Sequence, residues 1–338
     1  MKTVEQLLDV MTAPEDRLVG DMKKIDSDIM ILGAGGKVGT ALAVKAKRAM
    51  DAAGLNHRVI AVSLFDYQNS PAIMKDAGIE VIEANLLDEE QVKKLPKVRN
   101  IIFMVGKKFG TASNSSQTWA INVLLPGIIA KNFSKSNLVV FSTGNVYGMR
   151  DIHSGGALEE EPLEPIGEYA QTCVGRERVM EYYSKVNQTP MTFFRLNYAI
   201  DMRYGVLHDI AENVYQEKEI NLSTGYFNCI WQGNVVEYAI RSLLHCQTPP
   251  EILNITGPES ISVKWAAEEF GRRFKKEVRF VGEMPQSSLF SNSSKAIKLF
   301  GYPSVSLGQM IDWTSEWCLN RGDVISAPTH FEERCGKY

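Results

Sequence analysis

The sequence lacks the cysteine and histidine patterns that mark disulfide frameworks and metal sites. Among its 338 residues are only five cysteines and five histidines. No two cysteines have C-x-x-C spacing, and no two histidines stand four residues apart. We therefore expect no bound metal, and we expect the reduced thiols of a cytoplasmic protein rather than disulfides.

Two further absences narrow the class of protein. Lysine and arginine number 37 against 40 aspartates and glutamates, so the basic excess typical of nucleic-acid binders is missing. No run approaches the roughly 20 apolar residues that cross a membrane. The first 20 residues are too acidic for the apolar core of a signal peptide. We expect neither a nucleic acid nor a membrane as partner.

What the sequence does contain is a series of seven apolar, β-rich runs. They span residues 29–32, 58–65, 79–84, 100–105, 138–143, 191–196 and 251–256. Most are continuously apolar, which is typical of strands buried on both faces of a parallel sheet. Helix-length segments separate them, notably 38–53, 118–133 and 169–185. This order predicts an α/β fold, a Rossmann-type doubly wound parallel sheet.

The pattern also suggests how the chain is divided. Residues 1–26 are predicted to form a helical extension, because apolar side chains recur there at helical spacing until Pro14 breaks the pattern. Residues 27–200 are predicted to form a dinucleotide-binding domain, to which the chain returns around 226–258. Residues 201–225 and 259–338 are predicted to form a smaller, mostly helical substrate-binding region.

The first apolar run leads directly into the glycine-rich segment GAGGKVGT, residues 33–40, and then into a predicted helix. Gly33, Gly36 and Gly39 have the spacing that allows a tight turn, close approach of a pyrophosphate and close packing of the helix. Lys37 and Val38 would present their backbone N–H groups to the phosphates. A P-loop is excluded because Lys37 is not followed by serine or threonine. The alternative is a glycine-rich turn without a ligand.

The end of the second run bears on the choice between NAD and NADP. An acidic residue there binds the ribose 2′-hydroxyl of NAD. Here Ser63 stands at that position, and Asp66 reaches the ribose only if the loop curls back. Since no arginine follows to bind a 2′-phosphate, the pattern favours NAD and leaves NADP open.

Several stretches, from about residue 28 to 318, resemble one family. They are GAGGKVGT, EANLLD, IIFMVG, NVLLPG, FSTGNVYG, EYAQT and NSSKAIKLFGYPSVSLGQMIDWTSEW. The chain is similar to the extended short-chain dehydrogenase/reductases, specifically their NAD-dependent epimerase/dehydratase group. The resemblance implies an oxidoreductase or epimerase that acts on a secondary alcohol of a sugar or sugar-derived substrate. It also implies a homodimer that pairs through the helix carrying the catalytic tyrosine.

The resemblance assigns catalytic roles and exposes one departure. Tyr169 matches the family's acid/base, and Thr143 matches the residue that hydrogen-bonds the reacting oxygen. The family's lysine, four residues after the tyrosine, lowers the pKa of the phenol. Here that residue is Cys173, which cannot supply the same positive charge.

Three explanations remain open for this departure. Another cation can replace the lysine, either Lys108 or Arg176, although Arg176 is expected on the helix surface. The positive nicotinamide ring can itself supply the field. Alternatively, the protein binds NAD(P) without catalysis, and Cys173 is a small buried apolar residue. A nucleophilic role for Cys173 is disfavoured because no histidine lies near it in the sequence.

The resemblance implies further contacts with cofactor and substrate. The remaining cofactor-binding candidates are Asn85, Leu86, Val105, Gly106 and Asn122, with Lys108 and Tyr169 also touching the cofactor. The substrate-side candidates are Asn145, Arg195 and Asn197. The acidic segment 159–165 weakly favours a substrate less charged than a nucleotide-sugar.

Overall fold

The computed structural model describes residues 1–65, 70–111, 113–325 and 329–337, and all seven predicted strands are present in it. The strands are β1 Ile29–Leu32, β2 Val59–Ser63, β3 Glu80–Glu83, β4 Asn100–Phe103, β5 Asn137–Thr143, β7 Met191–Leu196 and β12 Glu251–Ile255. They form one parallel sheet in the order β12-β7-β5-β4-β1-β2-β3. The predicted doubly wound α/β fold is confirmed.

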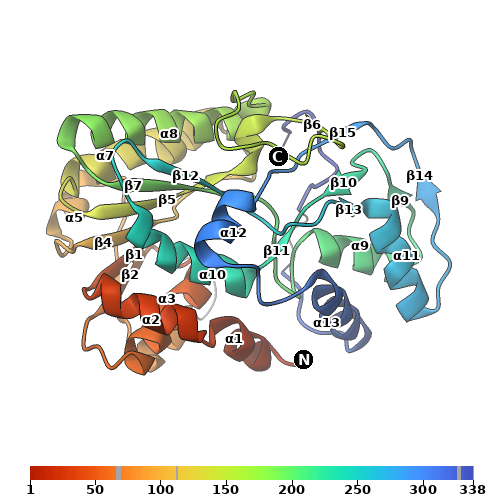
Figure 1. Ribbon diagram of the computed structural model, residues 1–338, viewed down its shortest axis with the longest axis horizontal. Coiled ribbons are helices and arrows are strands. Elements are labelled where there is room, and N and C mark those ends of the chain that lie inside the picture. Colours follow the sequence, from red (N-terminus) through yellow and green to blue (C-terminus); the bar gives the residue numbers. More distant parts are fainter. Residues whose placement is uncertain (66–69, 112, 326–328, 338) are drawn as a thin grey trace.

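The strand order explains where a ligand can bind. The chain builds outward from β1 to β2 and β3, and then returns to β4 on the other side of β1 (Figure 1). The connections after β1 and β4 therefore leave in opposite directions, which opens a crevice at the carboxyl ends of these two strands. The glycine-rich segment follows β1 directly and so lies at this crevice.

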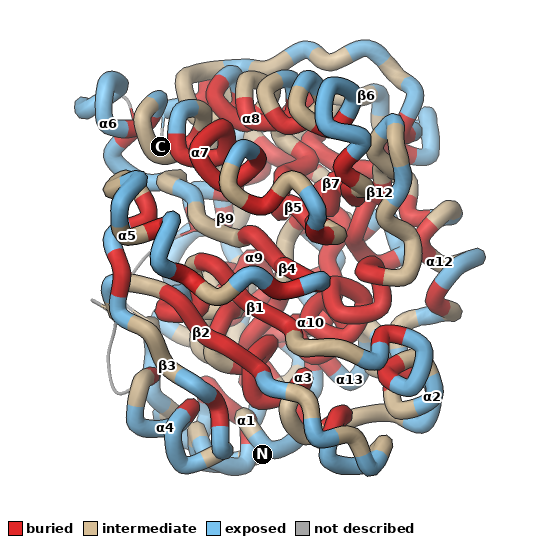
Figure 2. The backbone as a smooth tube through the Cα atoms, turned by 90° about the vertical axis from the view of Figure 1, so that its left-hand side faces the viewer, coloured by how far each residue is buried: buried red, intermediate tan, exposed pale blue. Residues whose placement is uncertain are grey.

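Side chains of the central strands alternate between two hydrophobic cores, one on each face of the sheet. Ile29 and Ile31 of β1 belong to one core, and Met30 and Leu32 belong to the other. All four are fully buried, as Figure 2 shows for the centre of the sheet. Burial on both faces is the physical reason why these runs are continuously apolar.

Helices cover both faces of the sheet (Figure 1). On one side lie α3 Gly39–Ala52, α4 Ser70–Asp76 and α10 Gln232–Arg241, and on the other lie α5 Glu89–Lys94, α7 Leu125–Asn132 and α8 Gly167–Asn187. The helix predicted over 118–133 is divided, because a π-helical turn at Ala120–Leu124 joins α6, Ser115–Trp119, to α7. Single π-helical turns of this kind often occur at functional sites.

The N-terminal extension contains two helices, where the sequence predicted one. They are α1 Val4–Thr12 and α2 Asp16–Ile25, and Pro14 lies between them as expected. Leu7 and Leu18 are fully buried in the core that also contains α3 and α10. Two ion pairs, Arg48 with Asp9 and Arg241 with Asp21, attach the extension to these two helices.

The C-terminal region is mostly helical, as predicted. Its helices are α9 Val206–Tyr215, α11 Val263–Phe274, α12 Ser294–Phe300 and α13 Leu307–Leu319. Two short strand pairs join it to the rest of the chain: β6 Arg150–Asp151 with β15 Ser287–Ser288, and β10 Tyr226–Phe227 with β13 Ile261–Ser262. The pair β9 Ile220–Asn221 with β14 Phe280–Val281 lies within it, and β8 Ala199–Ile200 with β11 Ile230–Trp231 lies beside it. Within the described residues, no helix has both the length and the apolar character to cross a bilayer.

Candidate active site

The glycine-rich loop between β1 and α3 has a shape that only glycine permits at two positions. Gly33 has a φ of +92°, and a Cβ there would lie 2.8 Å from Cγ2 of Val105. A Cβ on Gly39 would collide with the backbone of Ala34. At Gly36 a Cβ would meet nothing closer than the Gly33 carbonyl oxygen at 3.7 Å, so this part of the loop faces open space.

The first turn of α3 has the features of an anion site. Val38 is the N-cap residue, and its side chain makes no capping hydrogen bond. The exposed N–H groups and the partial positive charge at this helix end therefore suit the pyrophosphate of a dinucleotide. Together with the open face at Gly36, this arrangement fits the cofactor that the sequence predicts.

The residues expected to contact the adenosine of the cofactor differ in where their side chains lie. Ser63 ends β2, and its hydroxyl lies against Gly35, where a Cβ would approach it to 2.8 Å. The side-chain oxygen of Asn85 accepts a hydrogen bond from the backbone of Leu87 and so shapes its own turn. The Leu86 side chain is buried in the hydrophobic core. Asp66 lies outside the described residues.

A cavity of about 270 Å³ lies beside the glycine loop, at the carboxyl ends of β4 and β5. It brings together six of the candidate residues, namely Lys37, Val38, Gly106, Lys108, Thr143 and Tyr169. Asn145 and Asn197, predicted on the substrate side, also line it. Residues separated by more than 100 positions thus meet at one point.

Thr143 and Tyr169 are hydrogen-bonded partners in this cavity. The Thr143 hydroxyl also donates to Oδ1 of Asn145 at 3.0 Å and accepts from the Asn145 backbone at 3.2 Å. Burial raises the pKa of Tyr169 far above its usual value, and the neighbouring Cys173 raises it further. The Thr143 hydrogen bond and the charge of Arg176 oppose this rise.

Cys173 is a buried neutral thiol. Its residue is 1% exposed and packs in a small cluster with Val146, Tyr147 and Ala157. Burial raises its pKa to about 11, against the opposing charge of Arg176. The thiol thus behaves as an apolar side chain at neutral pH and supplies no charge to Tyr169.

Arg176 is not on the helix surface, so that expectation was wrong. It is 4% exposed and lines the cavity. Its guanidinium donates to the carbonyl of Phe141 at 2.7 Å and to Oδ1 of Asn122 at 3.0 Å. These bonds fix a positive charge one helical turn beyond Cys173, on the face of α8 that carries Tyr169.

Lys108, in the loop after β4, also lines the cavity. Burial lowers its pKa to about 8, while Asp209 and Cys173 act in the other direction. Its ammonium group is 3.5 Å from the carbonyl oxygen of Thr329, a residue of the C-terminal tail that also lines the cavity. Asp209 in turn accepts hydrogen bonds from the backbone and hydroxyl of Thr329.

Asn122 and Arg195 are among the predicted residues that do not line the cavity. The side-chain amide of Asn122 is hydrogen-bonded to the loop after β4. It accepts from the Lys107 N–H and donates to the Lys107 carbonyl, both at 2.9 Å. The substrate role expected for Arg195 does not fit its position. Arg195 is 3% exposed and forms a two-point ion pair with Glu177, with N–O distances of 3.0 and 2.7 Å.

The acidic segment 159–165 carries less free charge than the sequence suggests. Glu161 and Glu164 both pair with Arg150, at 3.0 and 2.8 Å. Glu159 is buried and accepts a hydrogen bond from the Asn254 backbone, which leaves Glu160 as the exposed carboxylate of the segment. The segment therefore weighs less against a charged nucleotide-sugar than its sequence suggests.

Sequence analysis missed three contributors to the site. Tyr204 places its ring 3.5 Å from the ammonium group of Lys37, while Asp209 and Thr329 form the contact described above. They lie far from the glycine loop in sequence and belong to no recognisable motif. Only the packing of the C-terminal region against the sheet brings them there.

Comparisons with known proteins agree with this architecture. Residues 29–222 match the model of a family described as NAD dependent epimerase/dehydratase. No curated protein matches the chain by sequence. The family match begins at β1, so α1 and α2 lie outside it.

Similar solved structures include three sugar-modifying enzymes. A mutant UDP-glucuronic acid 4-epimerase from Bacillus cereus, in complex with NAD and a fluorinated UDP-sugar, shares 15% identity over 87% of this chain and 99% of its own, with a TM-score of 0.70. The UDP-Glc/GlcNAc 4-epimerase from Campylobacter jejuni shares 18% identity over 87% of this chain and 99% of its own, with a TM-score of 0.70. A dTDP-glucose 4,6-dehydratase from Bacillus anthracis, in complex with NAD, shares 18% identity over 86% of this chain and 96% of its own, with a TM-score of 0.71.

Proposed function

Because this chain belongs to the NAD dependent epimerase/dehydratase family, we propose that it is an NAD-dependent oxidoreductase or epimerase. Its substrate in this proposal carries a secondary alcohol on a sugar, either free or linked to a nucleotide. The observation that carries the proposal is the hydrogen-bonded pair Thr143–Tyr169 in a cavity next to the glycine loop.

The proposed cofactor is NAD. Gly33, Gly36 and Gly39 would hold the loop open for the pyrophosphate, and the N-terminus of α3 would face its charge. When bound, NAD supplies the hydride acceptor or donor for oxidation and reduction of the carbinol carbon. We also propose that Lys108 binds a phosphate of the cofactor, since it lines the same cavity as Lys37 and Val38 of the glycine loop.

In the proposed chemistry, the Tyr169 oxygen takes the hydroxyl proton of the substrate during oxidation and returns it during reduction. The Thr143 hydroxyl hydrogen-bonds the same substrate oxygen and holds it near Tyr169. Asn145 and Asn197, which line the cavity, would orient the sugar hydroxyls. A phenol can do this work near neutral pH only if a positive charge lowers its pKa.

We propose that Arg176 supplies that charge in place of the family's lysine. Its charge is the cationic influence that lowers the pKa of Tyr169. Its bonds to Phe141 and Asn122 hold the guanidinium at a fixed distance. The planar guanidinium suits a buried position of this kind because it can donate several hydrogen bonds at once.

The proposed assembly is a homodimer formed through α6, the following π-helical turn and α8. This surface carries exposed apolar side chains, among them Trp119 at 42%, Leu124 at 60% and Tyr182 at 60% exposure. Val179 and Tyr183 of α8 line a hollow on the same surface. A cytoplasmic location is proposed from the five free cysteines.

The second candidate function is binding of NAD without catalysis. The raised pKa values of Tyr169 and Cys173 favour it, because neither group ionises near neutral pH in the protein alone. The two candidates differ in what Tyr169 does. Both require the glycine loop, but only the enzyme requires the phenolic oxygen.

A panel of free sugars, UDP-sugars and dTDP-sugars with NAD⁺ separates the two candidates. Absorbance of the reduced nicotinamide reports net oxidation, and product analysis reports epimerisation. We expect Tyr169→Phe to lower turnover roughly 10²- to 10⁴-fold, the usual contribution of an acid/base group, with NAD⁺ affinity retained. Tyr302→Phe, at a 72% exposed position outside the cavity and the proposed dimer surface, is the matched control. Tight NAD⁺ binding with no turnover of any sugar would support the non-catalytic candidate.

A further inference from the structure

Residues 329–337, which we call the strap, begin at a wall of the cavity that contains Tyr169. Thr329 lines this cavity. Its N–H and its hydroxyl donate hydrogen bonds to the Asp209 carboxylate of α9. Its carbonyl oxygen lies 3.5 Å from the Lys108 ammonium group. The strap therefore connects α9, in the C-terminal region, with the loop after β4.

Beyond Thr329 the strap is attached to the C-terminal region by one apolar and one charged side chain. Phe331 is 3% exposed and belongs to the hydrophobic core that contains α9. The guanidinium of Arg334 donates to the carbonyl oxygens of Ser223 and Ser287, at 3.3 and 2.8 Å. It also donates to the Ser287 hydroxyl at 2.8 Å. These contacts hold the middle of the strap in place.

The far end of the strap packs against the start of α8. The backbone of Gly336 lies on that of Ile166 and Gly167, so closely that a Cβ on Gly336 would collide with the Ile166 carbonyl oxygen. Gly167 is two residues before Tyr169 in the sequence. The strap thus joins the C-terminal region to both elements that carry Lys108 and Tyr169, and it lies outside the residues 29–222 that match the family.

The basic side chains of the cavity come from elements of the sheet half. Among the described residues that line it, they are Lys37, Lys108 and Arg176. Lys37 belongs to the glycine loop, and Lys108 is the proposed ligand of a cofactor phosphate. Arg176 is hydrogen-bonded within the protein. A diphosphate on the substrate would have to compete with the cofactor for the two lysines.

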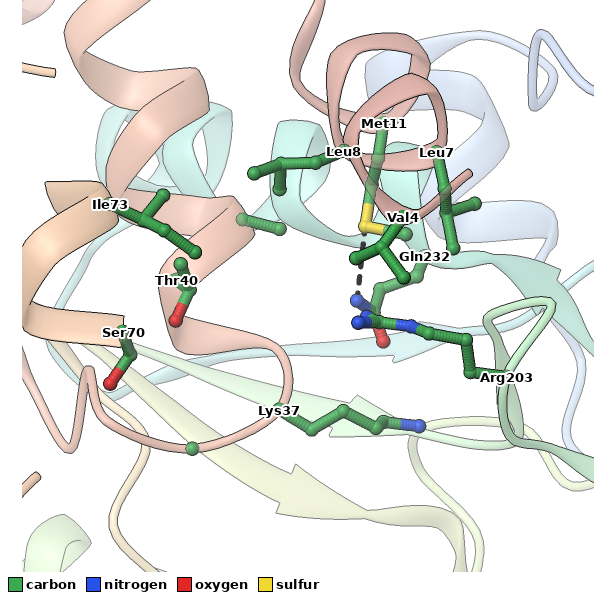
Figure 3. Close-up of a pocket in the computed structure, with 12 residues that line it drawn as sticks. Val4, Leu7, Leu8, Met11, Lys37, Thr40, Ser70, Ile73, Arg203 and Gln232 are labelled. Atoms are coloured by element: carbon green, nitrogen blue, oxygen red, sulfur yellow. Dashed lines mark hydrogen bonds between the residues drawn. The ribbon is translucent and has the colours of Figure 1, made fainter. Parts of the chain in front are cut away.

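The C-terminal region brings a carboxylate to this place instead of a further cation. Arg203 lines a different cavity, of about 380 Å³, beside α1 (Figure 3), and pairs with Asp201 at 2.6 Å. Gly205 and Val206, at the N-terminal end of α9, do line the cavity, but Asp209 stands in the first turn of this helix. Its carboxylate offsets the partial positive charge that a helix end offers to an anion.

The cavity is also small for a nucleotide-linked sugar. Its volume of about 270 Å³ is below the roughly 300–1,000 Å³ typical of small-molecule sites. The nicotinamide ring of the proposed cofactor would share this space with the substrate. A single sugar brings the hydroxyl that Thr143 and Tyr169 require, whereas a nucleoside with two phosphates needs room that the strap closes.

We propose that the strap excludes the nucleotide part of nucleotide-linked sugars, so that the substrate is a free sugar or a polyol of similar size. Thr329 would form the outer wall of the substrate site, held by Asp209. This inference rests on the proposed function, which leaves the sugar either free or linked to a nucleotide, and it selects between the two.

Matched pairs of ligands test the proposal: glucose, galactose and glucuronate, each free and linked to UDP. The full-length protein is titrated calorimetrically with each ligand in the presence of NAD⁺, and initial rates are measured for every ligand that is turned over. We expect a free sugar to bind more tightly than its UDP-linked form. The UDP-linked form would bind only to molecules with a displaced strap, and its apparent affinity is reduced by that fraction.

Two substitutions loosen the strap without removing its apolar anchor. Arg334→Met removes the hydrogen bonds of the guanidinium, and Gly336→Ala places a Cβ against the backbone at the start of α8. Loss of one hydrogen bond to a charged group corresponds to roughly a tenfold change in an equilibrium. The affinity for the UDP-linked sugar should therefore rise roughly tenfold, whereas the affinity for the free sugar should not rise. Gly54→Ala is the matched control, because its φ of +71° resembles the +73° of Gly336 and nothing lies within 4 Å of its Cβ.

Each outcome bears on the strap or on the proposed function. The inference is overturned if wild type binds a UDP-linked sugar at least as tightly as the free one, or if no sugar of either kind binds. It is also overturned if both strap variants are folded and bind the UDP-linked sugar no better than wild type does. If no sugar is turned over, or NAD⁺ does not bind, while the tenfold rise persists, the proposed function fails and the role of the strap stands. If free sugars are turned over and the strap variants behave as wild type, the proposed function stands without this inference.

Discussion

The proposed cofactor half and the proposed catalytic half of this site are built by different physical means. Around the glycine loop, backbone conformation and the absence of side chains create the binding surface, as at Gly33 and Gly39. Around Tyr169, the surface consists of side chains from β5, α8 and the loop after β4. In the first half a local sequence motif sets the geometry, whereas in the second half several distant elements set it together.

This difference explains where a change in sequence can be tolerated. Gly33 and Gly39 allow no substitute without a collision or a strained φ. The positive charge beside Tyr169 can instead come from any residue that packs within reach of the phenol. Replacement of the family's lysine by Cys173 is accompanied by a buried arginine one helical turn later. We interpret Cys173 and Arg176 together as a shift of the positive charge from position 173 to position 176.

The largest effect is expected at Arg195, in the support of the catalytic half. Arg195→Met would leave Glu177 buried without its partner, because the pair is bidentate and both residues are at most 3% exposed. Breaking a buried ion pair costs about 3–5 kcal/mol. The free energy of unfolding in urea measures this loss. Asn197→Ala, which alters the cavity wall itself, should instead raise KM with less effect on stability. If Arg195→Met instead raises KM and leaves the free energy of unfolding nearly unchanged, Arg195 contacts the substrate.

The placement of Arg195 shows why part of the site escaped sequence-based prediction. The strands and the glycine loop follow from periodicity and a local motif, and the Thr143–Tyr169 pair follows from the family resemblance; the structure has all of them where they are predicted. Whether an arginine faces a ligand or a carboxylate depends on a partner elsewhere in the chain. Arg195 and Arg176 were both misplaced for this reason, since their partners lie on other elements.

The same limit applies to the N-terminal extension. The helical spacing was followed only as far as Pro14, although Leu18, Met22 and Ile25 of the second helix, α2, recur at the same spacing and are buried. That α1 packs against α3 follows only from the folded structure. The local sequence therefore predicts the helices and strands better than it predicts which of them pack together.

In the cofactor half, two glycines offer a matched test. Gly39→Ala forces a Cβ into the backbone of Ala34, whereas a Cβ at Gly36 has open space in the free protein. Overpacking of this kind costs about 1–3 kcal/mol. We expect Gly39→Ala to lower the melting temperature and Gly36→Ala to leave it unchanged while weakening NAD⁺ binding. If Gly36→Ala binds NAD⁺ as tightly as wild type, the pyrophosphate does not approach the loop there.

In the catalytic half, removal of the Arg176 charge should raise the pKa of Tyr169 still further. A nearby opposite charge shifts a pKa by about 1–3 units, so Arg176→Met should lower turnover at neutral pH roughly tenfold or more. The alkaline rise in the pH profile of kcat/KM should move to higher pH. The double variant Cys173→Lys with Arg176→Met restores the family's arrangement and should recover turnover. If the pH profile does not shift, the positive charge that lowers the pKa of Tyr169 comes from the bound nicotinamide ring instead.

The smallest effect expected is a pH dependence of cofactor binding that joins the two halves. Burial lowers the pKa of Lys108 to about 8 from its usual 10.5, so the lysine loses its proton as pH rises through 8. NAD⁺ affinity should then fall severalfold between pH 7 and 9, because the charged form binds phosphate. Stability of the protein without ligand should change in the opposite direction. Between about pH 8 and 10.5 the unfolded chain binds more protons at this residue, and the free energy of unfolding rises with pH. Lys108→Arg keeps its charge over this range and should flatten both curves. An unchanged pH dependence of NAD⁺ affinity in Lys108→Arg would place the phosphate contact elsewhere.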